Sequence, residues 1–179
     1  RFSRFVRKNG QDSIKGDYEE FYKDGKPRFL VEFAKGQIHG AIRTWSNSGQ
    51  MNREVYIVNG LLHGSYKDFF ENGSPKVIGN YLEGKKHGVF EFINEDGAIL
   101  SKEEYINGLA DGEFMHTYQD GFPRERSIYS KGNLVSQIKY NEEQIFSIYK
   151  QQINGNLVDF EVELHEKTFE PNGNKKWHY

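Results

Sequence analysis

Glycine recurs along this chain at a fixed interval of 24 residues. Three series share the interval and hold 15 of the 19 glycines: Gly16, Gly40, Gly64, Gly88 and Gly112; Gly25, Gly49, Gly73, Gly97 and Gly121; and Gly36, Gly60, Gly84, Gly108 and Gly132. A fixed period of roughly 20 to 50 residues is typical of repeat proteins, in which each unit contacts only its neighbours. We therefore expect an array of repeats.

Two of the three series lie in turn signals. The second series follows Asp, Ser or Asn, as in Asp96-Gly97, and the third follows Lys, Asn or Glu, as in Asn59-Gly60. Asn-Gly and Asp-Gly are strong hairpin signals, because a type I′ turn needs positive φ at both central residues. Ten such turns in succession predict an antiparallel meander.

The segments between the turns have the pattern of β-strands. The shorter segments alternate, as in Phe29, Val31 and Phe33, and the first glycine series lies inside the longer ones, where a glycine usually marks a bulge or a bend. A hydrophobic content of 36% with 28% charged residues is low for a compact globule. The predicted fold is all-β, an elongated single-layer antiparallel meander of 24-residue β-hairpin repeats.

The period also predicts how the chain is divided. Residues 16–135 contain five repeats, 16–39, 40–63, 64–87, 88–111 and 112–135. Residues 1–15 are interpreted as the remnant of a preceding repeat, so the array is expected to begin upstream. Residues 136–179 are interpreted as degenerate repeats and a C-terminal cap, with a further hairpin turn at Asn154-Gly155, because an array must protect its edge strands.

Two positions of the repeat are apolar in all five units. They are occupied by Tyr18, Ile42, Tyr66, Phe90 and Phe114, and by Phe33, Ile57, Tyr81, Tyr105 and Tyr129. Equivalent residues lie two strands apart, or roughly 9.5 Å, so that large rings are needed to bridge the gap. We expect these ladders to form the core.

The sequence Glu83-Gly84-Lys85-Lys86-His87-Gly88 resembles the Asn-Gly-Lys-x-His-Gly signature of MORN repeats. The ordinary MORN unit has a further glycine two residues later, where this chain has Ile42, Tyr66, Phe90 and Phe114. The chain is therefore more similar to the bacterial MORN-repeat variant, the YwqK-like family often labelled as antitoxin components. The resemblance covers roughly residues 16–135 and implies an elongated row of hairpins with a binding role.

Neither a metal site nor a catalytic site is predicted. His39, His63 and His87 occupy one position of successive units, but ligands to one zinc must lie within about 2.1 Å of it and the units are roughly 9.5 Å apart. We interpret them as residues that hydrogen-bond or stack beside turns; Asp111 and Val135 replace them in the next units. Motifs for nucleophilic, phosphate-binding or metalloprotease chemistry do not occur, so we predict a non-enzyme without a cofactor.

The charge balance restricts the class of partner. Lys and Arg number 24 against 26 Asp and Glu, a net charge of −2, so no global field attracts nucleic acid or anionic lipid, and we expect no nucleic-acid partner. Resemblance to MORN repeats suggests phosphoinositide or membrane-surface binding as an alternative, yet that needs clustered basic residues, and pairs such as Lys85 and Lys86 are isolated. We expect a monomer that binds a protein partner; a passive spacer in a longer chain stays open. Since no cysteine occurs, the composition does not assign a compartment.

The candidate partner surface is the face of the shorter strands that lacks the periodic aromatics. It comprises Tyr56, Val58, Ile78, Leu82 and Ile106, with Glu32 and Glu104 in the same rows. A single-layer sheet cannot cover both of its faces, so these apolar side chains are expected to stay partly in water unless a partner docks there. The alternative is that they are ordinary β-forming residues on a solvated face.

Overall fold

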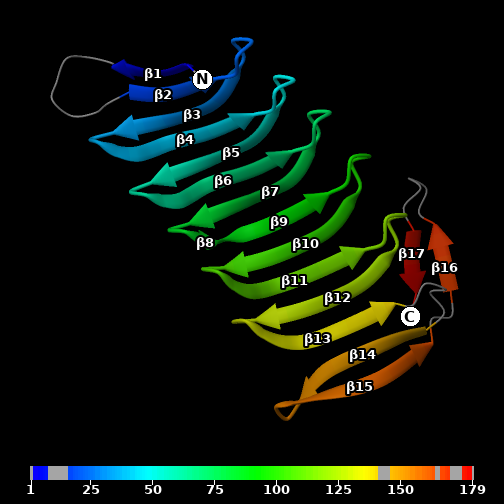
Figure 1. Ribbon diagram of the computed structural model, residues 1–179. Helices are drawn as coiled ribbons and strands as arrows, with labels where there is room; N and C mark the ends of the chain where they lie inside the picture. The colour runs from blue at the N-terminus through cyan, green and yellow to red at the C-terminus, as the bar shows by residue number, and fades with distance from the viewer. Residues whose placement is uncertain (1, 8–15, 141–145, 164–165, 170–174, 179) are drawn as a thin grey trace.

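The computed structural model describes residues 2–7, 16–140, 146–163, 166–169 and 175–178, and side chains over 16–140 and 150–158. Within these ranges the chain is all-β and forms no helix (Figure 1). The strands are β1 (Phe2–Arg7), β2 (Gly16–Phe21), β3 (Pro27–Ala34), β4 (Gln37–Trp45), β5 (Met51–Val58), β6 (Leu61–Phe69), β7 (Pro75–Leu82), β8 (Lys85–Lys86), β9 (Gly88–Ile93), β10 (Ile99–Ile106), β11 (Leu109–Thr117), β12 (Pro123–Ser130), β13 (Asn133–Tyr140), β14 (Phe146–Ile153), β15 (Asn156–Glu163), β16 (Glu166–Phe169) and β17 (Lys175–His178).

Strands β1 to β15 form one open antiparallel sheet in which each strand pairs with its neighbours in the sequence. Short β8 pairs with β7 beside the main path, and β16 and β17 form a separate hairpin. Figure 1 shows the strands following one another along a single twisted layer. The predicted meander of β-hairpins is thereby confirmed.

The turns at the two edges of the sheet differ in type. In the third glycine series both turn residues have positive φ, as at Asn59 (50°) and Gly60 (79°), which is the predicted type I′ geometry. The Asn154-Gly155 hairpin between β14 and β15 has the same geometry, with φ of 50° and 82°.

In the second series positive φ occurs at the glycine alone, so the expectation of type I′ turns is wrong there. The N–H of Gly25 donates to the carbonyl of Tyr22 (3.0 Å) and the N–H of Tyr22 donates to the carbonyl of Lys26 (2.8 Å). This is a three-residue loop, a type I turn followed by a left-handed glycine. Both sets of turns contain an Asn-Gly or Asp-Gly type of dipeptide, but in the longer loop only the glycine needs positive φ.

Three glycines of the first series, Gly40, Gly64 and Gly112, lie in β-bulges, where the sequence predicted bulges or bends. Val55 pairs with Tyr66 and Ile57 with Leu62, so that three residues of β6 lie opposite Tyr56 alone. Gly64, in the middle of the three, has a φ of 92°. The same shift occurs between β3 and β4 around Gly40 and between β10 and β11 around Gly112.

The core is a row of rings on one face of the sheet, which we call the ring face. From Tyr66 to Tyr129, each ring contacts the ring on the next strand of the sheet, with ring centroids 4.8 to 5.8 Å apart. The row consists of Tyr66, Tyr81, Phe90, Tyr105, Phe114 and Tyr129. The two predicted ladders therefore alternate in one row rather than each bridging two strands. Phe90 is 1% exposed and its ring covers Gly79, where a Cβ would collide with it.

Candidate functional site

The seven residues of the predicted partner surface all lie on the face opposite the ring face. They alternate along their strands with residues that point to the rings; on β10, for example, Glu104 and Ile106 flank Tyr105. They do not form one compact cluster, because Glu32 on β3 and Glu104 on β10 are six strand steps apart, or about 29 Å.

Glu32 and Glu104 each lie over a bulge. The Glu32 carboxylate accepts a hydrogen bond from the Ala41 N–H (3.0 Å), and a Cβ at Gly40 would collide with it. Glu104 occupies the same place over Gly112. Both carboxylates therefore have a structural role at the bulges that their position in the sequence does not reveal.

Five apolar side chains of this face lie beside the type I′ turns, three of them exposed and two, Val58 and Leu82, half-buried. Val58 pairs with Leu61, Leu82 with Lys85, and Ile106 with Leu109. Leu61 is 49% exposed, Ile106 48% and Leu109 53%. We call Val58, Leu61, Leu82, Ile106 and Leu109 the apolar rim.

Tyr56 and Ile78 are half-buried and lie further from the turns than the apolar rim does. The predicted partner surface does not include Leu61 and Leu109, which directly follow the turn glycines Gly60 and Gly108. Their spacing of two repeats could have identified them.

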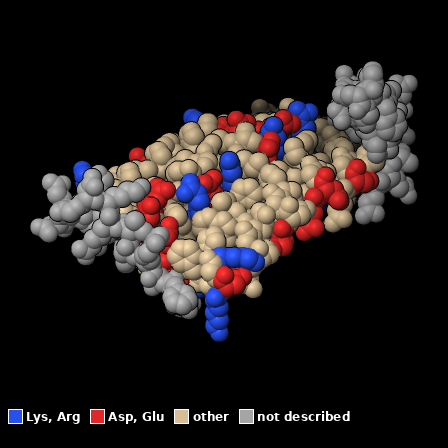
Figure 2. Space-filling model, turned by 90° about the horizontal axis from the view of Figure 1, so that it is seen from above, with Lys and Arg blue, Asp and Glu red and all other residues tan. Residues whose placement is uncertain are grey.

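Three basic residues on this face pair with carboxylates on a neighbouring strand. Arg43 pairs with Glu54 (2.7 Å), Lys102 with Glu91 (3.9 Å), and Arg126 with Glu113. The hydrogen bond that Arg43 donates to the Glu54 carboxylate raises the pKa of Arg43. Seen from above, acidic and basic side chains are interspersed around a broad uncharged area (Figure 2).

On the ring face, polar side chains run beside the aromatic row. Arg53 donates two hydrogen bonds to the Asp68 carboxylate (2.6 and 2.8 Å), and the Tyr66 hydroxyl donates a third (2.9 Å). Burial raises the pKa of Asp68, but the hydrogen bonds from Arg53 and Tyr66 outweigh it and hold that pKa below the usual value. Burial, together with the bond to Asp68, raises the pKa of Tyr66 to about 12.

Lys86 interrupts the apolar character of the ring face. Its ammonium lies 4.7 Å from the centroid of Phe90 and 4.5 Å from that of Tyr105, and 3.5 Å from Glu103. Rings and a carboxylate stabilise a cation together. Sequence reasoning placed Lys86 in a local basic pair, whereas its ammonium is held inside the protein's own aromatic cage.

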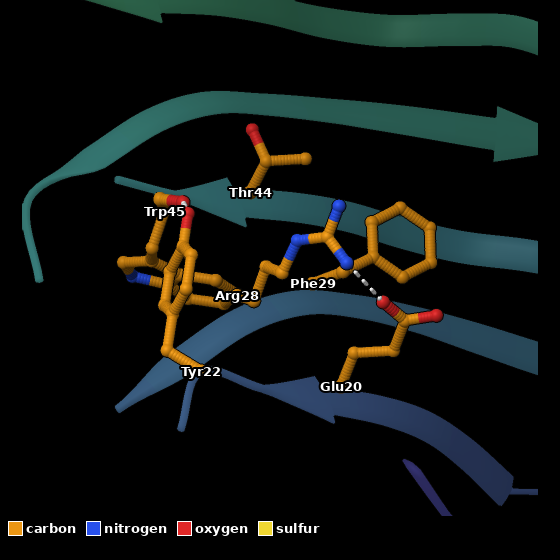
Figure 3. Close-up of a pocket in the computed structure, with 6 residues that line it drawn as sticks. All are labelled: Glu20, Tyr22, Arg28, Phe29, Thr44 and Trp45. Carbon is orange, nitrogen blue, oxygen red and sulfur yellow. Dashed lines mark hydrogen bonds and ion pairs between the residues drawn. The ribbon is translucent and has the colours of Figure 1, made fainter. Parts of the chain in front are cut away.

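A hollow of about 390 Å³ opens on the ring face at the N-terminal end of the described repeats. Its lining residues come from β2, β3, β4 and the turn after β2; they are Glu20, Tyr22, Arg28, Phe29, Thr44 and Trp45. Figure 3 shows the Arg28 guanidinium between the Tyr22 and Trp45 side chains on one side and Phe29 on the other. Arg28 donates to Glu20 across the floor (2.9 Å).

One of the periodic histidines, His87, forms a hydrogen bond beside a turn. Nδ1 of His87 accepts a hydrogen bond from the N–H of Asn107, the first residue of the next type I′ turn (3.4 Å). One unit later, the Asp111 carboxylate accepts from the Lys131 N–H (3.3 Å). Asp can therefore replace His because both side chains provide an acceptor for the next turn.

No group of three or more His, Asp or Glu residues in the described part of the chain could hold a metal ion. No helix there has the length and apolarity needed to cross a membrane. The chemistry that the described side chains offer is recognition, through an apolar rim on one face and a mixed aromatic and polar hollow on the other.

A family model described as MORN repeat variant matches the chain twice, at residues 62–83 and 86–107. The two matches begin 24 residues apart, in agreement with the glycine period. Repeats of this type are non-catalytic and in general bind proteins or membranes. No curated protein matches the chain.

Proposed function

Because the chain carries MORN repeats of the variant type, we propose that it is a non-catalytic scaffold that binds a partner protein through the face opposite the rings. The binding would neutralise or tether that partner. The proposed contact surface consists of the apolar rim together with Tyr56 and Ile78, with Glu32 and Glu104 along its length.

The observation that carries this proposal is the exposure of the apolar rim. Leu61, Ile106 and Leu109 each leave about half of their surface in water. Ile106 and Leu109 are paired on adjacent strands β10 and β11, and Leu61 lies on β6, three strand steps from β10. Exposed apolar rows of this kind are a usual feature of protein interaction surfaces. Tyr56, at the inner border of the row, is the type of residue that most often anchors an interface.

Membrane-surface binding is the second candidate, because repeats of this type include membrane binders. Anionic lipid headgroups attract clusters of Lys and Arg. On this face Arg43, Lys102 and Arg126 are paired with carboxylates, which favours a protein partner.

The experiment has two stages. Affinity capture with mass spectrometry identifies a partner, and its affinity is then measured for Leu82→Asp and Tyr56→Ala, after circular dichroism has shown that both variants fold. We expect Leu82→Asp to weaken binding by at least about tenfold, because a charge would be buried against an apolar partner. Ile99→Asp, at the other edge of the sheet, serves as the matched control.

Binding that stays within about twofold of the parent for both variants would remove this face from consideration and direct attention to the bend side around Trp45 and His63. Flotation with phosphoinositide-containing vesicles tests the second candidate. Vesicle binding that Leu82→Asp leaves unchanged would favour the membrane over a protein partner.

A further inference from the structure

The hollow lined by Tyr22, Arg28 and Trp45 lies on the ring face, away from the proposed docking surface. We propose that it is a second recognition site, one that binds a carboxylate carried by a partner polypeptide beside an apolar or aromatic group. The proposal concerns a different face and a different chemistry from the apolar rim.

The hollow has unused hydrogen-bond donors. Arg28 carries five N–H donors, and Glu20 is the one acceptor that the described residues provide for it, at one terminal nitrogen. Figure 3 shows the other terminal nitrogen pointing away from Glu20, on the side of Thr44. No described residue forms a hydrogen bond with the Thr44 hydroxyl. A guanidinium edge with a nearby hydroxyl is suited to a carboxylate.

Each carboxylate oxygen of Glu20 already accepts one hydrogen bond. One Glu20 oxygen accepts from the Tyr18 hydroxyl (2.9 Å) and the other accepts from Arg28. Glu20 therefore holds Arg28 in place, and a cationic ligand would have to compete with Arg28 for it. The Arg28 N–H groups that do not face Glu20 can donate to an acceptor that comes from outside.

Aromatic side chains form the walls. The Tyr22 hydroxyl donates to the carbonyl of Trp45 (2.7 Å), which fixes the Tyr22 ring beside the indole. Phe29, the cross-strand neighbour of both Glu20 and Thr44, lies on the other side. Walls of this kind lower the local dielectric and strengthen a charge-assisted hydrogen bond. They also offer apolar contact to the atoms that carry the carboxylate.

The fifth repeat provides a matched comparison. Tyr118 and Arg124 occupy the positions of Tyr22 and Arg28, and the Tyr118 hydroxyl again donates to a carbonyl, that of Tyr140 (3.3 Å). Glu125 stands there at the position of Phe29, so one wall is replaced by a carboxylate. Arg124 thus resembles Arg28 in sequence but lacks the apolar wall that Phe29 supplies.

The test uses phenylacetate as the probe, with phenylacetamide and benzylamine as its neutral and cationic analogues. Binding is followed by NMR through the Trp45 indole N–H and the Arg28 Nε–H. We expect phenylacetate to bind at least about fivefold more tightly than either analogue. Arg28→Gln should weaken phenylacetate binding by at least about fivefold, and Thr44→Val by about twofold.

Glu20→Gln gives the sharpest result, since it removes the competing negative charge while it keeps the shape of the side chain. We expect it to strengthen phenylacetate binding by about twofold to fivefold. Arg124→Gln and Leu82→Asp should leave the affinity for phenylacetate within about twofold of the parent. The test of the hollow is thus independent of the test of the apolar rim as a partner surface. Circular dichroism checks that each variant is folded.

Equal binding of phenylacetamide, preference for benzylamine, or weaker phenylacetate binding by Glu20→Gln would each overturn the proposal. Two peptides then distinguish the source of the carboxylate. One carries an internal glutamate and an amidated end, and the other carries glutamine and a free C-terminal carboxylate. Binding of either peptide with loss in Arg28→Gln supports the proposal and names the source, whereas binding of neither overturns it.

Discussion

At the scale of single residues, the type I′ turns carry an avoidable strain. Glu83 has a φ of 50°, a left-handed conformation that costs roughly 1 kcal/mol or more for a residue other than glycine or asparagine. Asn59 and Asn107 occupy the same position in neighbouring units with φ of 50° and 51°. The repeat therefore tolerates a less suitable residue at Glu83 without changing its turn.

We expect Glu83→Asn to raise the free energy of unfolding by about 0.5 to 1 kcal/mol, since asparagine adopts positive φ more readily. Urea denaturation measures the change. Asp96→Asn is the control, because Asp96 also precedes a glycine but its own φ is not positive. An equal gain from both variants would show that the effect comes from charge rather than from backbone geometry.

At the scale of paired strands, β5 and β6 are joined on the ring face by Arg53, Asp68 and Tyr66. The folded pKa of Asp68 lies below its unfolded value of about 3.9. Ionised Asp68 therefore stabilises the fold at every pH above that value, and this contribution is lost as the pH falls through the folded pKa.

We expect Asp68→Asn to lower the free energy of unfolding by about 1 kcal/mol at neutral pH, and the difference from the parent to disappear as the pH falls through the folded pKa of Asp68. Denaturant titrations at several pH values test this. Glu113→Gln removes an exposed pair with Arg126, whose side chains are 46% and 50% exposed, and should change stability much less. A difference that persists in acid would contradict the role of the charge.

Strands, turns and bulges were predictable because glycine is needed wherever the backbone takes positive φ, and that need recurs with the period. The prediction of type I′ turns is correct for only one of the two sets of turns. Asp96-Gly97 and Asn107-Gly108 are similar in sequence, but the loops that contain them differ in length. The single row of rings depends on the offset between neighbouring strands, which no single segment encodes.

The two faces were predictable from alternation, but the individual roles on them were not. Glu32 lies over a bulge in the neighbouring strand, a contact that requires the register between β3 and β4. The hollow likewise depends on Arg28 of β3 reaching Glu20 on the neighbouring strand β2. The residues in such contacts belong to no recognisable sequence motif, and they meet only because of the register between neighbouring strands.

At the scale of the whole molecule, a single-layer sheet predicts an elongated particle. Fourteen strands in the main path give thirteen steps of about 4.8 Å, or about 62 Å along the stacking direction. We expect a radius of gyration of about 20 Å in small-angle scattering, against about 16 Å for a compact globule of this length. A value near 16 Å with a symmetric distance distribution would contradict the open sheet. A concentration series separates shape from self-association.

Each repeat consists of two antiparallel strands and both kinds of turn. A duplicated or deleted repeat therefore re-enters the sheet with the same side chains on the same face. Gene duplication could lengthen or shorten such a protein in increments of about 9.6 Å while the docking rows and the aromatic row stay continuous. The length of the sheet can therefore change by whole repeats during evolution, while the side chains that each face presents stay the same.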